Sequence, residues 1–256
     1  MSINWSFIIL GNNNYIRNLV TSLNYEDLYF YEDGDEGIDL TYYFSSIHLN
    51  HLTEPIQIYS KAQQICSLLN GLDLIIQEDK AEHYPIVLDR LIDVNNEKVV
   101  FFKKPANSNV FDVDFSINKS PTPTQKNYIT QIFEITKDDD FILNLLFIIS
   151  DGMTFQTLYQ AYDEIRTFLK YKKDNLSKLG FTKETTSQFT HTANNYGALG
   201  KSARHGNTGQ SPPQIPMLIE DAQLLITNII RKTLKKYYSI DLPKKKSMKI
   251  DISDLF

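Results

Sequence analysis

The segment Ser120–Thr124 most constrains the fold, because it divides the chain into two halves with different hydrophobic patterns. Its prolines, Pro121 and Pro123, fix φ and lack a backbone N–H, so a regular helix or central strand cannot pass through them. Short stretches of alternating apolar and polar residues precede this segment, and apolar residues at helical spacing follow it. We therefore predict an α+β fold with two domains, residues 1–120 and residues 121–256.

The first half predicts a mixed, mostly antiparallel sheet with one helix. This helix begins at Thr53-Glu54-Pro55, where a capping hydroxyl, an early acid and a proline favour a helix start, and it ends at Asn70-Gly71. Gly11 and the run Asn12–Asn14 end the first strand. The predicted strands are Trp5–Leu10, Ile38–Leu49, Leu72–Gln77, Ile86–Val94, Lys98–Lys104 and Val110–Ile117.

The second half predicts an all-helical domain. Apolar residues recur there at helical spacing, and hydroxyl or carboxylate side chains stand at the expected starts of helices. A loop with several prolines and glycines, Gly206–Pro216, precedes the last helix. The predicted helices are Gln125–Ile135, Asp139–Ser150, Phe155–Lys173, a helix capped by Thr182 that runs to about Asn194, and Met217–Ser239.

Composition excludes several classes of protein. The single cysteine, Cys66, excludes an internal disulfide and a cysteine-based zinc site. No apolar run approaches the roughly 20 residues of a membrane span, and the N-terminus lacks the basic region of a signal peptide, so we expect a cytoplasmic protein that binds no membrane. His48, His51 and His83 do not follow a metal-binding motif, and we predict neither a metal nor a cofactor.

Charge divides unevenly between the two halves. Residues 1–120 carry 8 Lys/Arg and 17 Asp/Glu, whereas residues 121–256 carry 18 and 14. A basic half suits an anionic partner such as RNA, DNA or a nucleotide, although the charge can also simply differ between two domains. The basic end of the last helix with Lys244–Lys246 could follow a nucleic-acid backbone, with Tyr237 and Tyr238 stacking on bases, or could be a solvated tail. The segment Ile250–Phe256 could bind a protein partner.

The stretch Phe189–Gly206 concentrates the side chains best suited to a site. An arginine offers a planar charged donor for phosphate or carboxylate, and a histidine can transfer a proton near neutral pH. Glycines let backbone N–H groups turn toward an anion, and asparagines can hydrogen-bond a ligand. The candidate ligand-binding residues are Asn194, Asn195, Gly197, Gly200, Lys201, Ser202 and Arg204, and the candidate catalytic residues are His205, His191 and Arg204.

The same stretch also has a purely structural interpretation. Asn194 and Gly197 would end a helix, Arg204 would pair with a carboxylate to fix the loop, and His205 would be a structural histidine. The sequence leaves both interpretations open. The position of Arg204 and His205, in a cleft or toward the core, distinguishes them.

Three short motifs resemble a family of bacterial proteins without an assigned activity. These are Thr192-Ala193-Asn194, Gly200-Lys201-Ser202-Ala203-Arg204-His205 and Pro216-Met217 before a last helix, and Leu68-Leu69-Asn70-Gly71 is similar upstream. The helical half also resembles the HEPN superfamily, which implies a helical bundle and includes metal-independent ribonucleases of defence and toxin systems. That superfamily separates its active arginine and histidine by four to six residues, whereas Arg204 and His205 are adjacent here.

The leading hypothesis is a binding module that holds an anionic ligand, a nucleotide or nucleic acid, in the Asn194–His205 loop. The alternative is a HEPN-like, metal-independent ribonuclease that uses Arg204 with His205 or His191. A third hypothesis is a scaffold or regulatory partner without catalysis. The sequence does not decide whether the protein is an enzyme.

Overall fold

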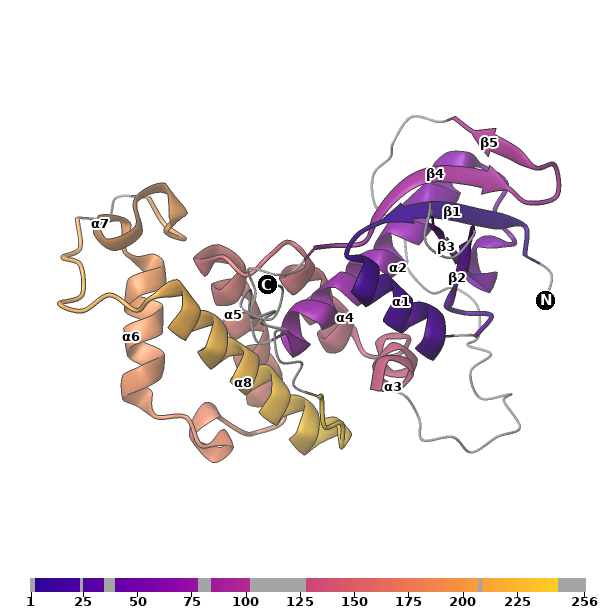
Figure 1. Cartoon of the computed structure of the whole chain (residues 1–256). Coiled ribbons are helices and arrows are strands. Elements are labelled where there is room, and N and C mark those ends of the chain that lie inside the picture. Colours follow the sequence, from indigo (N-terminus) through magenta and orange to yellow (C-terminus); the bar gives the residue numbers. More distant parts are fainter. Residues whose placement is uncertain are drawn as a thin grey trace, which may run out of the picture. The chain divides into compact units, whose positions relative to one another are not determined.

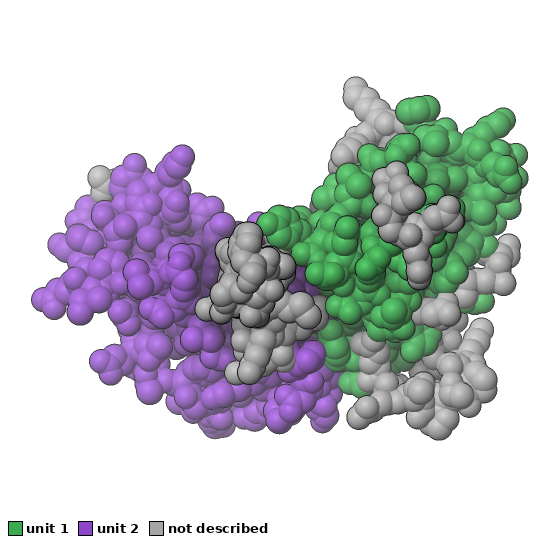
Figure 2. All heavy atoms as spheres, viewed as in Figure 1, with its two compact units in different colours: residues 1–70, 83–137 green, residues 71–82, 138–256 purple. Residues whose placement is uncertain are grey.

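The computed structural model describes residues 3–23, 25–34, 40–77, 84–101, 128–206 and 209–243. The chain forms two compact units, Met1–Asn70 with His83–Lys137 and Gly71–Glu82 with Asp138–Phe256 (Figure 1; Figure 2). The first unit carries a sheet and the second is helical, which confirms the predicted α+β class. The predicted boundary between domains, the segment Ser120–Thr124, lies outside the described residues, as does the predicted strand Val110–Ile117.

Within the described residues, the first unit holds one antiparallel sheet of five strands in the order β2-β3-β1-β4-β5. The central strand is β1, which buries Phe7 and Ile9 on one face. Phe7 lies opposite Phe44 of β3 and Leu91 of β4, so one apolar row crosses the sheet. The strands are β1 (Trp5–Leu10), β2 (Tyr29–Asp33), β3 (Thr41–Ser45), β4 (Val87–Asp93) and β5 (Lys98–Val100).

Three predicted strands, Trp5–Leu10, Ile86–Val94 and Lys98–Lys104, are confirmed with the same or shorter bounds over their described residues, which exclude 102–104, and one strand was missed. The structure places β1, β4 and β5 at predicted positions, whereas β2 was not predicted. The predicted strand Ile38–Leu49 is too long, because β3 ends at Ser45 and Ile47–Leu49 forms a 3₁₀ turn. The Ser46 hydroxyl accepts a hydrogen bond from the backbone of His48, and this local cap starts the turn.

Two helices, α1 (Asn13–Ser22) and α2 (Pro55–Ile76), accompany the sheet (Figure 1). The ring of Phe7 meets that of Tyr59 on α2 at 6.1 Å, and the hydroxyl of Tyr15 on α1 donates to the carbonyl of Leu69 at 3.3 Å. The sequence did not predict α1. Asn12 was interpreted only as the end of a strand, but its side chain accepts from the backbone of Tyr15 and caps the helix.

The predicted end of α2 at Asn70-Gly71 is wrong, and so is the strand predicted at Leu72–Gln77. The helix continues to Ile76. Asn70 and Gly71, whose residue types predicted a helix end, make tertiary contacts instead. The Asn70 amide bonds the backbone of Ile86 through both of its polar atoms, at 2.8 and 3.1 Å. Gly71 leaves room for the backbone of Leu146, since a Cβ at this position would lie 2.2 Å from its carbonyl oxygen.

The helical unit is built around α5, which contacts α4, α6 and α8 (Figure 1). Phe168 of α5 stacks on Phe141 of α4 with ring centroids 4.0 Å apart. Phe189 of α6 is fully buried and packs on the rings of Tyr159 and Tyr162. The helices of this unit are α4 (Asp140–Ser150), α5 (Phe155–Tyr171), α6 (Lys183–Asn194), α7 (Tyr196–Leu199) and α8 (Ile219–Tyr238), whereas α3 (Tyr128–Thr136) belongs to the first unit.

Local signals place these helices well. The predicted cap Thr182 accepts a hydrogen bond from the third residue of α6, and Asp139, where a predicted helix begins, accepts one from the third residue of α4. Each predicted helix of the second half matches a helix of the structure to within a few residues at its ends. The stretch between α6 and α8 contains the short helix α7 and a 3₁₀ turn, Gly200–Ser202, and it carries the predicted site.

Candidate functional site

Asn195 holds the predicted site together where α6 ends. Its side chain is 1% exposed, and its oxygen accepts from the backbone of Ala198, which caps α7. Its amide donates to the carbonyls of Gln210 and Ser211 at 3.2 and 2.9 Å. Gly197 lies close to this side chain: a Cβ at position 197 would be only 3.1 Å from the Asn195 side-chain oxygen. Both residues therefore shape the loop, and the polar atoms of Asn195 are used within the protein.

Arg204 is fixed by contacts with α5 and α6. Its guanidinium lies over the ring of Tyr159, 4.3 Å from the centroid, and 3.5 Å from the carboxylate of Asp163. Its backbone N–H donates to the carbonyl of Ala193 at 2.9 Å. The side chain is still 38% exposed, so Arg204 lies at the surface of the helical unit and is pinned there by a cation–π contact and an ion pair.

His205 lies beside Arg204, with 3.3 Å between the guanidinium and its Nε2. Lys201, Ser202 and His205 are exposed. The carbonyl of Ala203 between them accepts from the Gln156 side chain at 3.2 Å, and Gly200 has φ of 56°. The structure thus places Arg204 beside His205 and leaves Lys201 exposed, on a segment whose backbone is anchored from α5.

The remaining candidates, Asn194 and His191, have other contacts. The Asn194 amide donates to the carbonyl of Thr190 one turn earlier, and its oxygen is buried without a hydrogen-bond partner among the described residues. His191 is exposed and donates from Nε2 to the carbonyl of Ser211 at 3.3 Å. Neither side chain has a described contact with Arg204 or His205.

A cavity of about 610 Å³ lies beside this loop's anchor, in the helical unit. Three elements line it: α5, the segment that follows α5, and the first turn of α6. Its basic residues are Arg166, Lys170 and Lys183, and Asp163, the partner of Arg204, stands on its wall. Asp163 also lies 3.7 Å from Arg166, so one carboxylate connects the loop to the cavity.

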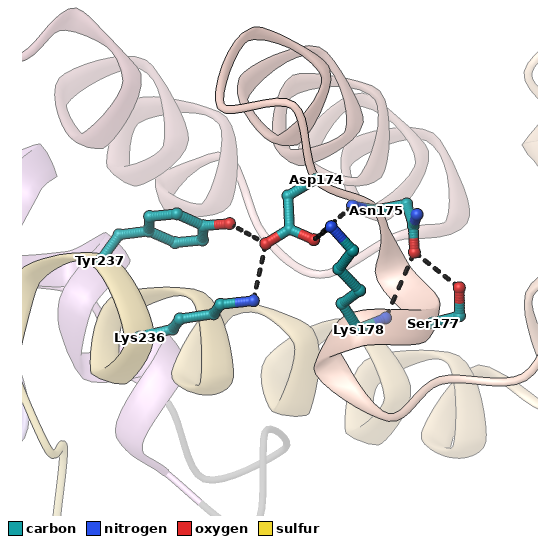
Figure 3. A network of polar contacts seen from close by, with 6 residues as sticks. All are labelled: Asp174, Asn175, Ser177, Lys178, Lys236 and Tyr237. Atoms are coloured by element: carbon teal, nitrogen blue, oxygen red, sulfur yellow. Dashed lines mark hydrogen bonds and ion pairs between the residues drawn. The ribbon is translucent and has the colours of Figure 1, made fainter.

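A polar network on the same cavity wall joins the end of α5 to the end of α8 (Figure 3). Its centre is Asp174, whose side chain is 8% exposed. The carboxylate accepts from Lys236 at 2.6 Å, from the hydroxyl of Tyr237 and from the backbone of Asn175, and Lys178 lies 3.6 Å away. The hydrogen bond from Lys236, then that from Tyr237, holds the pKa of Asp174 well below its usual range.

This network and its neighbours occupy the basic end of α8. Lys232 donates to the carbonyl of Leu179, and Lys235 lies 2.6 Å from Asp241. Burial, followed by the hydrogen bond to Asp174, raises the pKa of Tyr237 to about 12. Tyr238 donates to Asp139, and both tyrosine rings contact Phe168. The side chains at this helix end are thus engaged within the protein. The segments Lys244–Lys246 and Ile250–Phe256 lie outside the described residues.

We expect Asp174→Asn to remove the part of the pH dependence of stability that comes from ionisation of this carboxylate. Because the folded-state pKa of Asp174 is depressed, the charged group stabilises the fold above the ordinary carboxyl pKa of about 3.9, and this contribution disappears as pH falls through the folded value. Thermal unfolding of wild type and Asp174→Asn should therefore differ most above about pH 4, and the difference should shrink progressively as the pH falls below that value. A difference that stays constant over this range would contradict the assignment.

Sequence reasoning missed the residues of the cavity and Asp174 at the centre of the network, although it named Tyr237 at the end of the last helix. Arg166 and Lys170 are spaced to share one face of α5, and Lys183 directly follows the predicted cap Thr182. The sequence therefore indicates where each residue lies on its own helix. Nothing local indicated that the two helices bring these charges to one cavity. Asp174 lies in a turn after α5, and its partners Lys236 and Tyr237 come from the end of α8.

The three histidines considered for metal binding lie in different environments. His48 is fully buried, and its Nε2 lies 3.2 Å from the equally buried carboxylate of Asp27; His51 is exposed, and His83 lies outside the described residues. Over the described ranges, no cluster of three or more His, Cys, Asp or Glu residues could hold a metal ion. In the same ranges, no helix combines the length and apolar character needed to cross a membrane.

The features of the candidate site belong to one compact unit of the protein. Its exposed basic loop, the carboxylate that anchors the loop and the adjacent basic cavity all lie in the helical unit. No protein-family model, curated protein or solved structure matches the chain.

Proposed function

We propose that this protein is a binding module whose Asn194–His205 loop holds an anionic ligand, a nucleotide or nucleic acid. The observation that supports it is an exposed basic cluster on an anchored backbone. Lys201, Ser202 and His205 are exposed, and Arg204 is partly exposed between Tyr159 and Asp163. A loop that is already ordered loses little conformational entropy when a ligand binds, so more of the contact energy contributes to affinity.

The residues of the loop divide into two roles in this proposal. Lys201, Ser202 and His205 donate to the anion, because their side chains are exposed at neighbouring positions. Arg204 adds charge while it holds the loop on α5. Asn195 and Gly197, which were predicted to contact ligand, instead keep the loop in shape, since the Asn195 side chain is already hydrogen-bonded to the backbone.

We expect the double variant Lys201→Ala/His205→Ala to weaken binding of labelled single-stranded RNA, DNA or ATP by about tenfold, because one full charge and one donor are lost. The dependence of affinity on salt should also decrease by about one unit of slope between roughly 50 and 200 mM salt, as for one lost phosphate contact. Fluorescence anisotropy measures both quantities on the full chain.

A matched control is Lys235→Ala. Lys235 is exposed and pairs with Asp241, outside the loop, so its replacement should change affinity by less than about twofold. Equal losses in the two variants would show binding to overall charge and would contradict a loop site. If wild-type protein binds none of the three probes at low salt, the proposal fails and a scaffold role gains support.

A second candidate is a metal-independent ribonuclease, favoured by the 3.3 Å contact between Arg204 and the exposed His205. In this function His205 transfers a proton and Arg204 stabilises the charge that develops on phosphate. Incubation of RNA with the protein in EDTA should then give cleavage that His205→Ala reduces by at least about 100-fold. Intact RNA, or undiminished cleavage by the variant, would eliminate this candidate.

A further inference from the structure

We infer that the cavity between α5 and the start of α6 binds a small phosphate-bearing ligand of the size of a nucleoside monophosphate. Its volume of about 610 Å³ lies within the range of small-molecule sites, roughly 300–1,000 Å³. The inference shares the anionic ligand class of the proposed function but assigns the ligand to different residues. The cavity is partly open to solvent, so a small molecule can enter it, and its volume is that of a small-molecule site rather than of an extended nucleic-acid groove.

Two helices direct positive charge to this cavity. Arg166 and Lys170 come from α5, and Lys183 is the first residue of α6. No hydrogen bond or ion pair of the Lys170 or Lys183 side chain is found among the described residues, so both are available to a ligand. The cavity also borders the N-terminal turn of α6, where the helix dipole favours an anion.

The acidic residues of the wall do not cancel the charge of Lys170 and Lys183, because each already has other cationic partners. Asp163 pairs with Arg204 and Arg166 at 3.5 and 3.7 Å. Asp174 pairs with Lys236 and Lys178, which with Arg204 are not lining residues. The carboxylates therefore serve to hold the wall in place, and the lysines of α5 and α6 determine the sign of the ligand.

The rest of the lining suits the non-phosphate part of such a ligand. Leu169, Leu176 and Phe181 supply apolar surface, and the hydroxyls of Thr167 and Thr186 supply donors and acceptors. Lys232 of α8 lies over the Phe181 ring, with its Nζ 4.5 Å from the ring centroid. A phosphate near the lysines with an aromatic or sugar group against this apolar surface satisfies both parts of the cavity.

The test is isothermal titration of the full chain with AMP, inorganic phosphate and adenosine. AMP should bind, phosphate should compete with it, and adenosine should bind at least about tenfold more weakly, because the charged contacts carry much of the affinity. Lys170→Ala/Lys183→Ala should weaken AMP binding by about tenfold or more. Both lysines are exposed, so circular dichroism and thermal unfolding should show an unchanged fold.

Two controls separate this inference from the loop proposal. Lys235→Ala should change AMP affinity by less than about twofold, and the loop variant Lys201→Ala/His205→Ala should leave it intact. Absence of AMP binding, or a loss confined to the loop variant, overturns the inference; in the latter case the loop proposal stands. A loss confined to the cavity variant supports the inference while the loop proposal fails. Displacement of AMP by an RNA oligonucleotide whose binding needs both cavity lysines would overturn the small-ligand class.

Discussion

Replacing Gly71 by alanine should lower the free energy of unfolding by about 1–3 kcal/mol, although alanine is the better helix former. Gly71 lies inside α2, where the exchange alone would gain about 1 kcal/mol in helix propensity. The new Cβ, however, would lie 2.2 Å from the carbonyl oxygen of Leu146, much closer than any normal contact. Backbone cannot rotate away as a side chain can, so α2 or α4 must shift and the steric cost exceeds the propensity gain.

Urea denaturation followed by circular dichroism measures this loss. Gln63→Ala is the matched control, because Gln63 is exposed on the same helix and its truncation should change stability by no more than about 0.5 kcal/mol. A Gly71→Ala protein as stable as wild type, or more stable, would contradict the close approach of the α4 backbone. The interpretation of Gly71 as a helix end would then have to be reconsidered.

Replacing Asn195 by alanine should cost about 2–4 kcal/mol and loosen the candidate loop. The change removes two donors to the carbonyls of Gln210 and Ser211 and the acceptor that caps α7. Because Asn195 is 1% exposed, water cannot easily take over these bonds, and an unmet buried polar group costs about 1–3 kcal/mol. The loop then loses its fixed shape, so any ligand affinity it supports should fall with the stability.

Asn194→Ala is the control, since it changes the neighbouring amide. Asn194 donates only to Thr190 in its own helix, and its oxygen already lacks a described partner, so its removal should cost about 1 kcal/mol or less. Denaturant unfolding gives the stabilities, and hydrogen exchange of residues 195–206 reports on the loop. Equal effects of the two variants would contradict the role assigned to Asn195.

Sequence reasoning worked best where one local interaction decides the structure. The carboxylate of Asp139 and the hydroxyl of Thr182 cap helices within the next few residues, and the apolar stripe of α5 follows from helical spacing. It failed where a residue with a local preference serves a distant partner. Asn70 and Gly71 have the residue types of a helix end, yet one bonds Ile86 and the other admits the backbone of Leu146.

The candidate site shows the same division. Residue types alone marked Phe189–Gly206 as the richest stretch for a ligand, and they predicted both a binding loop and a loop pinned by an ion pair. The structure supplies the pin, since Arg204 lies on Tyr159 and beside Asp163. It leaves Lys201 and His205 exposed, so the ion-paired Arg204 and exposed basic side chains occur on the same loop.

By itself, the sequence determined the α+β class, most of the helices, and the loop in which basic donors gather. Only the tertiary structure decided that Asn195 is buried, that Asp163 joins the loop to a cavity, and that Asp174 holds the end of α8. The physical reason is the distance along the sequence over which each kind of interaction acts. Helix caps and hydrophobic periodicity act over a few residues, whereas ion pairs, cavities and close backbone contacts depend on which distant segments pack together.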